Sequence, residues 1–379
     1  MASFFTRASA ALDRGVIRYM ERRMVPRTPR IGARDARARL AALAAAYGED
    51  TLGVPSRFFP EPEAPAVTLA PAGDGPLGTQ AIDLTWHSEY EPFLPEAYDL
   101  HARVTENHMA HARLWTSGHG RPTIVLLHGW AGGNHWVTAR AFAAPYWLRH
   151  GYDVAAFVLP YHGVRAPGPS GARRSLLWPS LNPLWTNEGF GQAIYDLRAL
   201  SRFLRARGAP AVGAMGMSLG GYTAALWASV AGRPPGARPG GAASDGRAPE
   251  NDPGGIDFAV AMIPAVSMAW LMWRHGEGNP VRRAAARAGV TEDLLADAFA
   301  VHAPTTRPPR LPRARLAVIA GRGDRITPPE HAEELARHWG VEVGWFAGGH
   351  LAQVGRGDAL RAVRRQLGAL DLPGREFRP

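Results

Sequence analysis

Three residues in the second half of the chain are of the types that catalyse acyl transfer together. Ser218 lies in the segment GMSLG (216–220), which fits the pattern G-x-S-x-G. Asp324 follows in GRGDRITPP and His350 in AGGHL. A serine hydroxyl is a poor nucleophile at neutral pH, so a base must accept its proton and a third group must hold that base. The residue types and their order predict that Ser218 attacks, His350 transfers the proton and Asp324 orients His350.

Each of the three follows a segment that is typical of a buried strand. The apolar runs are AVGAMGM before Ser218, RLAVIAG before Asp324 and VEVGWFA before His350. Further strands are predicted in AIDLTWHSEYE (81–91), HARLWTS (111–117), TIVLLHGW (123–130), DVAAFVLP (153–160) and FAVAMIP (258–264). Helical patterns such as GQAIYDLRALSRFLRARG and GYTAALWASVAG alternate with them. This alternation predicts an α/β fold with helices on both faces of the sheet.

Attack on a carbonyl builds negative charge on oxygen, and fixed donors must face that oxygen. The turn HGWAGG follows a predicted strand and offers the backbone N–H of Trp130, while Leu219 offers a second N–H directly after the nucleophile. These two groups are the predicted oxyanion hole. His128 is expected to brace the turn, because the base in this arrangement follows the acid in the sequence.

Two segments are candidates for binding the substrate. Tyr161, His162 and Arg165 lie in PYHGVRAP after a strand end and are predicted to line the pocket, with a purely structural loop as an even alternative. Residues 267–312, rich in Met and Trp, are inserted between two strands and predict a helical lid, in which Trp270 contacts substrate. A helix pair packed on the core is the alternative. The aromatic content favours an apolar acyl or aryl group in the substrate.

The segment 3–24 predicts an amphipathic helix. Apolar residues recur at helical spacing, and most of the arginines lie off this stripe; the stripe is Phe5, Ala8, Leu12, Val16 and Tyr19. Docking of the stripe on the protein itself is the favoured prediction, and peripheral contact with a membrane is the alternative. The Pro-rich segment 53–76 is interpreted as a linker, and the Gly- and Pro-rich segment 231–255 as a mobile loop.

The chain resembles the α/β-hydrolase superfamily over roughly residues 78–370. The residues that carry the resemblance are HGW (128–130), GMSLG, Asp324 and His350. The resemblance implies a mostly parallel central sheet with helices on both faces and a helical lid insertion, in a domain of residues 61–379 after a helical extension, 1–60. A narrower resemblance, to the α/β-hydrolase domain-containing protein 18 family and its bacterial relatives, is carried by LPYHGVRAP, GMSLGG, GDRITPP and GGHL. Members of that family are treated as serine hydrolases.

The motifs and the resemblance together predict a serine hydrolase that cleaves a carboxylic ester or thioester through an acyl-enzyme, with no cofactor and no metal. Peptidase or acyltransferase chemistry on the same fold is an alternative. A different alternative is a non-catalytic scaffold that binds a membrane or a protein partner.

Composition narrows the class of partner. The net charge is +10 and every basic residue is arginine, but the arginines are scattered, so no nucleic-acid partner is expected. Absence of cysteine excludes disulfides and thiolate chemistry. The sequence has no run of 18 apolar residues and no secretory signal at its start, which predicts a cytoplasmic enzyme that acts on a small-molecule ester.

Overall fold

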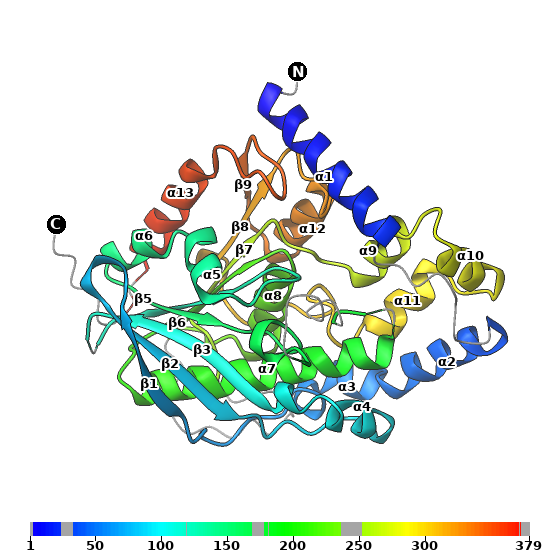
Figure 1. Cartoon of the computed structure of the whole chain (residues 1–379), viewed down its shortest axis with the longest axis horizontal. Helices are drawn as coiled ribbons and strands as arrows, with labels where there is room; N and C mark the ends of the chain where they lie inside the picture. Colours follow the sequence, from blue (N-terminus) through cyan, green and yellow to red (C-terminus); the bar gives the residue numbers. More distant parts are fainter. Residues whose placement is uncertain are drawn as a thin grey trace.

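The computed structural model describes residues 3–23, 33–118, 120–168, 178–180, 182–235, 252–370 and 372. Nine strands form one sheet in the order β1-β2-β3-β5-β4-β6-β7-β8-β9 (Figure 1). Six neighbouring strands are parallel: β5 (Asp153–Phe157), β4 (Thr123–Leu127), β6 (Val212–Met217), β7 (Phe258–Met262), β8 (Leu316–Gly321) and β9 (Val343–Phe346). Strands β1 (Thr68–Asp74), β2 (Gln80–His87) and β3 (Met109–Thr116) extend one edge in antiparallel pairing. The predicted mostly parallel sheet is confirmed.

Helices cover both faces because the central strands are apolar on both. In β4, Val125 and Leu127 belong to one core and Ile124 and Leu126 to the other, as the alternation of side chains along a strand requires. Helices α7 (Pro183–Ala206), α8 (Leu219–Ala231) and α12 (Pro329–Trp339) supply the first core. Helices α5 (His135–Ala141), α6 (Ala144–Arg149) and α13 (Arg356–Gly368) supply the second.

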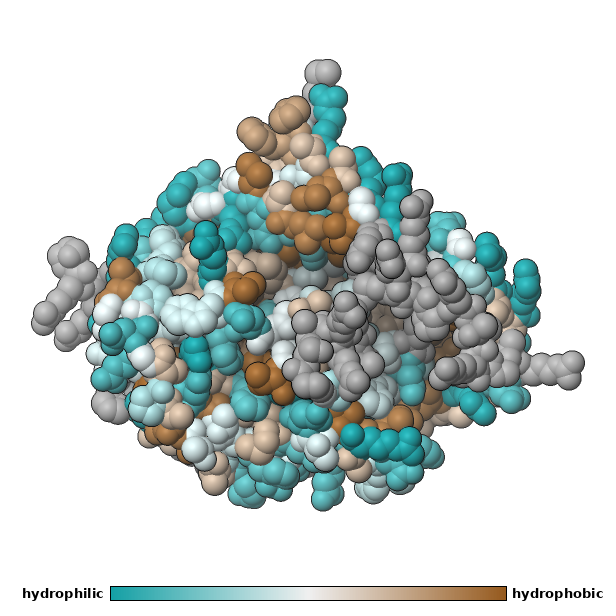
Figure 2. Space-filling model, viewed as in Figure 1, coloured by the Kyte–Doolittle hydropathy of each residue, from teal (hydrophilic) through white to brown (hydrophobic). Residues whose placement is uncertain are grey.

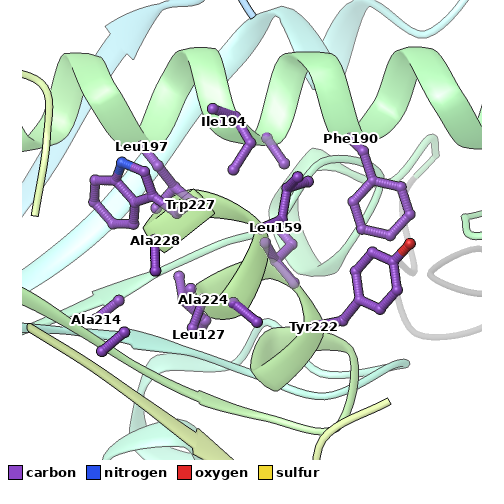
Figure 3. Packing of buried hydrophobic residues seen from close by; sticks show 14 of the residues in the cluster. Leu127, Leu159, Phe190, Ile194, Leu197, Ala214, Tyr222, Ala224, Trp227 and Ala228 are labelled. Atoms are coloured by element: carbon purple, nitrogen blue, oxygen red, sulfur yellow. The ribbon is translucent and has the colours of Figure 1, made fainter. Parts of the chain in front are cut away.

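The first core is densest where α7 and α8 cross the sheet. Figure 3 shows side chains of both helices pointing toward one another and toward Leu127 and Ala214 of the strands. Phe190 of α7 and Tyr222 of α8 have ring centroids 4.8 Å apart, and both side chains are fully buried. This packing fixes α8, and therefore the turn that precedes it, against the sheet.

Part of the helical extension packs with the insertion in a second group of helices. The extension contains α1 (Phe4–Arg23), α2 (Ala33–Ala46) and α3 (Glu49–Gly53), and the insertion contains α9 (Met268–His275), α10 (Pro280–Arg287) and α11 (Glu292–Phe299). Helix α2 packs against α10 and α11, with Leu40, Val290 and Ala298 buried between them. Helix α1 lies at the top of Figure 1 and contacts the loops that follow β8 and β9.

Short elements complete the fold: α4 (Tyr98–Ala102) and the 3-10 turns Pro55–Arg57, Pro76–Gly78, Pro95–Ala97, Thr105–His108, Gly163–Arg165 and Arg313–Arg315. Within the part of the chain that the structure describes, no helix combines the length and the apolar character needed to cross a bilayer.

The interpretation of 53–76 as a linker is wrong, because β1 occupies Thr68–Asp74 and pairs with β2. The strand was missed because it lies at the sheet edge, where its residues are mostly exposed and show no alternation of apolar and polar types. Its Pro71 is tolerated at an edge, and the pairing is irregular between Pro71 and Asp74. Of the segment predicted to be a mobile loop, residues 236–251 lie outside the described residues.

Candidate active site

Ser218 occupies a sharp turn between β6 and α8. Its φ of 59° lies in the left-handed region, which residues other than glycine rarely adopt. A Cβ at Gly216 would lie 1.9 Å from the Gly220 carbonyl oxygen, and a Cβ at Gly220 would lie 1.9 Å from that of Leu127. Both glycines are therefore required by close backbone approach, and the strained turn projects Ser218 from the carboxyl end of the sheet.

Asp324 and His350 form a buried pair at the ends of the next strands. His350 Nδ1 lies 2.8 Å from Asp324 Oδ2, and the two side chains are 9% and 1% exposed. The other carboxylate oxygen, Oδ1, accepts the N–H groups of Ile326 at 2.9 Å and Thr327 at 2.8 Å. Because Asp324 Oδ2 is an acceptor, Nδ1 of His350 carries the proton and Nε2 is left to accept one.

Opposing effects act on the pKa of His350. Burial lowers the pKa, whereas the charge of Asp324, its hydrogen bond and the charge of Asp13 raise it. The net effect raises the pKa of His350 above its ordinary value. Asp13 belongs to α1, so the N-terminal helix contributes to the electrostatics of this histidine.

Ser218 and His350 line one cavity of about 1500 Å³. The wall is mainly apolar, and its larger apolar side chains come from separate parts of the fold: Val16, Trp130, Val137, Phe142, Val164, Met217, Ile263, Ile326 and Leu351. It also includes the charged residues Glu106, Arg140 and Arg356. A hydroxyl and an imidazole thus face a mostly apolar space. Among the described residues, no group of three His, Asp or Glu side chains is arranged to hold a metal ion.

The turn after β4 lies against the serine. A Cβ at Gly129 would be 3.5 Å from Cβ of Ser218, so the backbone that continues to Trp130 passes beside the nucleophile. Leu219 is the first residue of α8, where a backbone N–H has no acceptor within the helix. Both predicted oxyanion donors therefore belong to backbone next to Ser218.

His128 braces this turn, as expected. The Leu159 N–H donates to its Nε2 at 3.1 Å, so Nδ1 carries the proton and donates to the Gly129 carbonyl at 2.8 Å. Burial lowers the pKa of His128 to about 3, which keeps the imidazole neutral.

The structure places Tyr161, His162 and Arg165 in the interior instead of the cavity wall. Arg165 is completely buried, and its Nη2 donates to Asp196 Oδ2 at 2.7 Å. His162 is also completely buried, with Nδ1 2.9 Å from the Pro160 carbonyl oxygen, while Tyr161 is 3% exposed. These contacts correct the substrate-binding assignment: the loop is held from inside by an ion pair with α7. The part of the loop that does line the cavity includes Val164.

The insertion also differs from the predicted lid. None of its described residues lines the cavity at Ser218. Trp270 instead packs edge-on against His331 of α12, with ring centroids 4.7 Å apart. Met272 and Trp273 line a second cavity of about 660 Å³ between the insertion and α2. The packing of α11 on α2 therefore turns the insertion toward the helical extension.

The N-terminal helix is the part of the site that sequence reasoning missed. Its buried residues are Thr6, Ser9, Ala10 and Asp13, and Val16 reaches the cavity. The apolar stripe predicted to dock on the protein does so only in part. Val16 reaches the cavity, but Phe5 is 53% exposed and Leu12 is 48% exposed; the side chain of Tyr19 lies outside the described residues. The docked face carries mainly small and polar residues at helical spacing, and this spacing of Thr6, Ser9 and Asp13 was the available signal.

Comparisons with known proteins agree with this architecture. A sequence model described as the alpha/beta hydrolase family matches residues 124–363. Uncharacterized proteins of Mycobacterium tuberculosis, strains CDC 1551 and H37Rv, are 28% identical to the chain over 282 residues. These matches cover 71% of this chain and 60% of the relatives, so the chain spans about 60% of their length.

Two acetyl xylan esterases are similar in structure. The enzyme from Paenibacillus sp. R4 has a TM-score of 0.53 at 13% identity, and the enzyme from Thermoanaerobacterium sp. JW/SL YS485 has a TM-score of 0.50 at 14% identity. Each comparison covers 92% of this chain and 98% of the esterase. At such identities the likeness concerns the fold. With the family match, the strand order and the strained serine turn taken together, the chain belongs to the alpha/beta hydrolase family.

Proposed function

We propose that this protein is a serine hydrolase that cleaves a carboxylic ester, or a thioester, through an acyl-enzyme on Ser218. The observation that supports it most is the convergence of a strained serine and an aspartate-bound histidine on one cavity. His350 Nε2 takes the proton as Ser218 Oγ attacks the carbonyl carbon. The protonated His350 then gives that proton to the leaving alcohol or thiol, and water releases the acid by the same steps in reverse order.

The backbone N–H groups of Trp130 and Leu219 are the proposed donors to the oxyanion. They lie on the two turns that meet at Ser218, and backbone donors need no reorganisation while charge develops. No metal or organic cofactor takes part in these steps.

The substrate is proposed to carry an apolar acyl or aryl group. The cavity wall is mainly apolar and includes Phe142, Ile263 and Leu351. The esterases that share the fold are described as acting on acetyl xylan, so short acyl groups belong in the test series. The test is hydrolysis of p-nitrophenyl esters of graded acyl length by the purified full chain. The proposal expects turnover of at least one ester; no turnover of any ester, thioester or aryl acetate by folded protein would contradict it.

The dependence of the rate on pH provides a separate prediction. Because His350 acts as a base, only its neutral form is active, and its pKa is raised above the ordinary value of about 6.5. The value of kcat/KM should therefore be low in acid, rise as pH increases through the raised pKa of His350, and level off above it. Stopped assays from pH 5 to 9 measure this profile. A value of kcat/KM that is constant across pH 6 to 8 would exclude the His350 imidazole as the base.

Other acyl-transfer chemistry is distinguished by the acceptor and the bond cleaved. A peptidase would cleave an anilide of the same acyl group, and an acyltransferase would prefer an added alcohol to water. The narrower likeness to the α/β-hydrolase domain-containing protein 18 family, in LPYHGVRAP, GMSLGG, GDRITPP and GGHL, supports the serine mechanism in the proposal and leaves the substrate to these assays.

We also infer peripheral contact with an anionic membrane through the outer face of α1. Phe4 is 77% exposed and, with Phe5 and Leu12, forms an apolar strip beside the exposed Arg7 and Arg14. Figure 2 shows apolar side chains gathered over this helix at the top of the view. An exposed apolar strip flanked by cations suits a bilayer that carries anionic lipids.

The membrane contact predicts that the full chain sediments with vesicles containing anionic phosphatidylglycerol at low salt and is released at high salt. The variant Phe4→Ala/Phe5→Ala/Leu12→Ala, which keeps the docked face intact, should remain in solution. Equal sedimentation of the variant and the wild type would contradict contact through this face.

A further inference from the structure

We propose that helix α1 contributes to the active site through Asp13. This aspartate is a positioning residue that holds the loop carrying Asp324 and the loop carrying His350 relative to each other. The inference rests on the proposed function, since it assigns to Asp13 the alignment of that acid and base. It adds a residue far away in sequence to a site otherwise built from the ends of strands.

The contacts of Asp13 carry the argument. Its side chain is completely buried, and its Oδ2 accepts the N–H of Arg325 at 3.1 Å and the N–H of His350 at 2.9 Å. Its Oδ1 accepts the N–H of Leu351 at 3.2 Å. One carboxylate thus holds the residue that directly follows Asp324, His350 itself and the residue after it. Hydrogen bonds to a buried carboxylate are among the stronger ones in proteins, so this bridge fixes the two loops relative to each other.

The rest of the docked face binds the same loops. Thr6 Oγ1 donates to the Ala347 carbonyl at 2.8 Å, and Ser9 Oγ donates to the Ala352 carbonyl at 3.2 Å. These two bonds enclose the His350 loop on both sides. Helix α1 therefore pairs both N–H and C=O groups of a loop that belongs to no strand or helix.

The glycines of the two catalytic loops fit this contact. A Cβ at Gly349 would lie 2.8 Å from Asp13 Oδ2, and a Cβ at Gly323 would lie 2.6 Å from the Thr6 carbonyl oxygen. Real Cβ atoms do not approach that closely, so each loop has glycine where α1 comes nearest. The docked helix therefore requires glycine at Gly323 in GRGD and at Gly349 in GGH. The chemistry of Asp324 and His350 alone does not require these glycines.

Asp13 also acts on His350 through its charge. The charged and titratable groups that face His350 are Asp324, from the connection between β8 and α12, and Asp13, from α1. Burial opposes both, but the two negative charges raise the pKa of the imidazole. Removal of the Asp13 charge should shift the titration of His350 to lower pH, which a purely structural contact would not do.

The test compares Asp13→Asn with wild type and with Asp35→Asn, an exposed aspartate on α2 that serves as the matched control. Three quantities are measured in the full chain: the rate of labelling by a fluorophosphonate probe, the pH profile of kcat/KM, and the NMR titration of the His350 ring, assigned with His350→Gln. Asp13→Asn should label about tenfold more slowly, because small displacements of catalytic groups are costly. The His350 titration and the acid limb of the profile should fall by about 0.5 pH unit or more.

A second variant, Asp13→Glu, keeps the charge but not the length of the side chain. Asp13→Glu should be labelled more slowly than wild type, while the pH at which His350 titrates should stay unchanged. Hydrogen exchange of wild-type protein gives a measurement independent of any variant's folding: the amides of Arg325, His350 and Leu351 should be protected.

The outcomes separate the two proposals. If wild type is not labelled at Ser218 but the His350 titration still shifts in Asp13→Asn, the hydrolase mechanism fails and the role of Asp13 in the electrostatics stands. If wild type is labelled and Asp13→Asn matches Asp35→Asn in labelling rate and titration, the role of Asp13 is overturned. Unprotected amides at the three positions would also overturn it.

Discussion

Replacement of Ser218 by alanine is expected to lower kcat for ester hydrolysis by about 10⁴-fold or more and to leave KM nearly unchanged. The hydroxyl is the only group removed, and without it no acyl-enzyme can form. Because alanine is as strained as serine at a φ of 59°, the free energy of unfolding should change little. Steady-state assays on one p-nitrophenyl ester, together with thermal unfolding, measure both effects.

The control is Ser229→Ala in α8, the helix that begins directly after Ser218. Ser229 is buried, and its hydroxyl donates to the Leu226 carbonyl within α8. This variant should keep kcat within about twofold, since it removes one ordinary hydrogen bond far from the reaction. Ser218→Ala protein with wild-type kcat would show that another group attacks the substrate.

The second large effect is expected for Asp324→Asn, which should lower kcat by about 10⁴-fold. Oδ1 accepts the N–H groups of Ile326 and Thr327, so the amide oxygen of an asparagine would be held at that position. Its NH₂ group would then face Nδ1 of His350 and donate to it. The imidazole would carry its proton on Nε2 and could not accept one from Ser218.

The chain offers a matched control in a second Arg-Gly-Asp segment, at 356–358. The Asp358 side chain is 86% exposed at the start of α13 and pairs with Arg361. Asp358→Asn should leave kcat unchanged within about twofold, because exposed ion pairs contribute little. If Asp324→Asn retained more than about a tenth of wild-type kcat, the assignment of Asp324 as the orienting acid would fail.

The sheet was predictable because the information is local. The central strands are apolar on both faces, and their runs stand out from the helical patterns between them, as in TIVLL and DVAAF. The close backbone approaches at Gly216 and Gly220 can also be inferred from the local sequence, because both positions require glycine. Pairing of Asp324 with His350 follows once both are placed at the ends of neighbouring parallel strands.

Contacts between distant segments were not predictable in the same way. The predicted lid, 267–312, has the composition of a pocket cover, yet its helix α11 packs against α2. Arg165 follows a strand end as a substrate ligand would, but its partner Asp196 lies on the face of α7 that is turned to the core. Periodicity gives the face of a helix and does not say which surface that face meets.

Helix α1 illustrates the same limit most clearly. Hydrophobic periodicity favoured docking through Phe5 and Leu12, because apolar burial is the usual driving force. The helix docks through Thr6, Ser9 and Asp13 instead, since loop backbone offers unpaired N–H and C=O groups that need polar partners. A pattern search for apolar stripes cannot detect a face selected for hydrogen bonding.

The central claim is that Ser218 is an activated nucleophile. We would treat the purified full chain with a fluorophosphonate probe at pH 8 and map the adduct by mass spectrometry of proteolytic peptides. The account predicts one adduct on Ser218 that is absent in Ser218→Ala and strongly reduced in Asp324→Asn. Folded protein without an adduct, or with an adduct at another serine, would contradict the account and favour a scaffold that binds without catalysis.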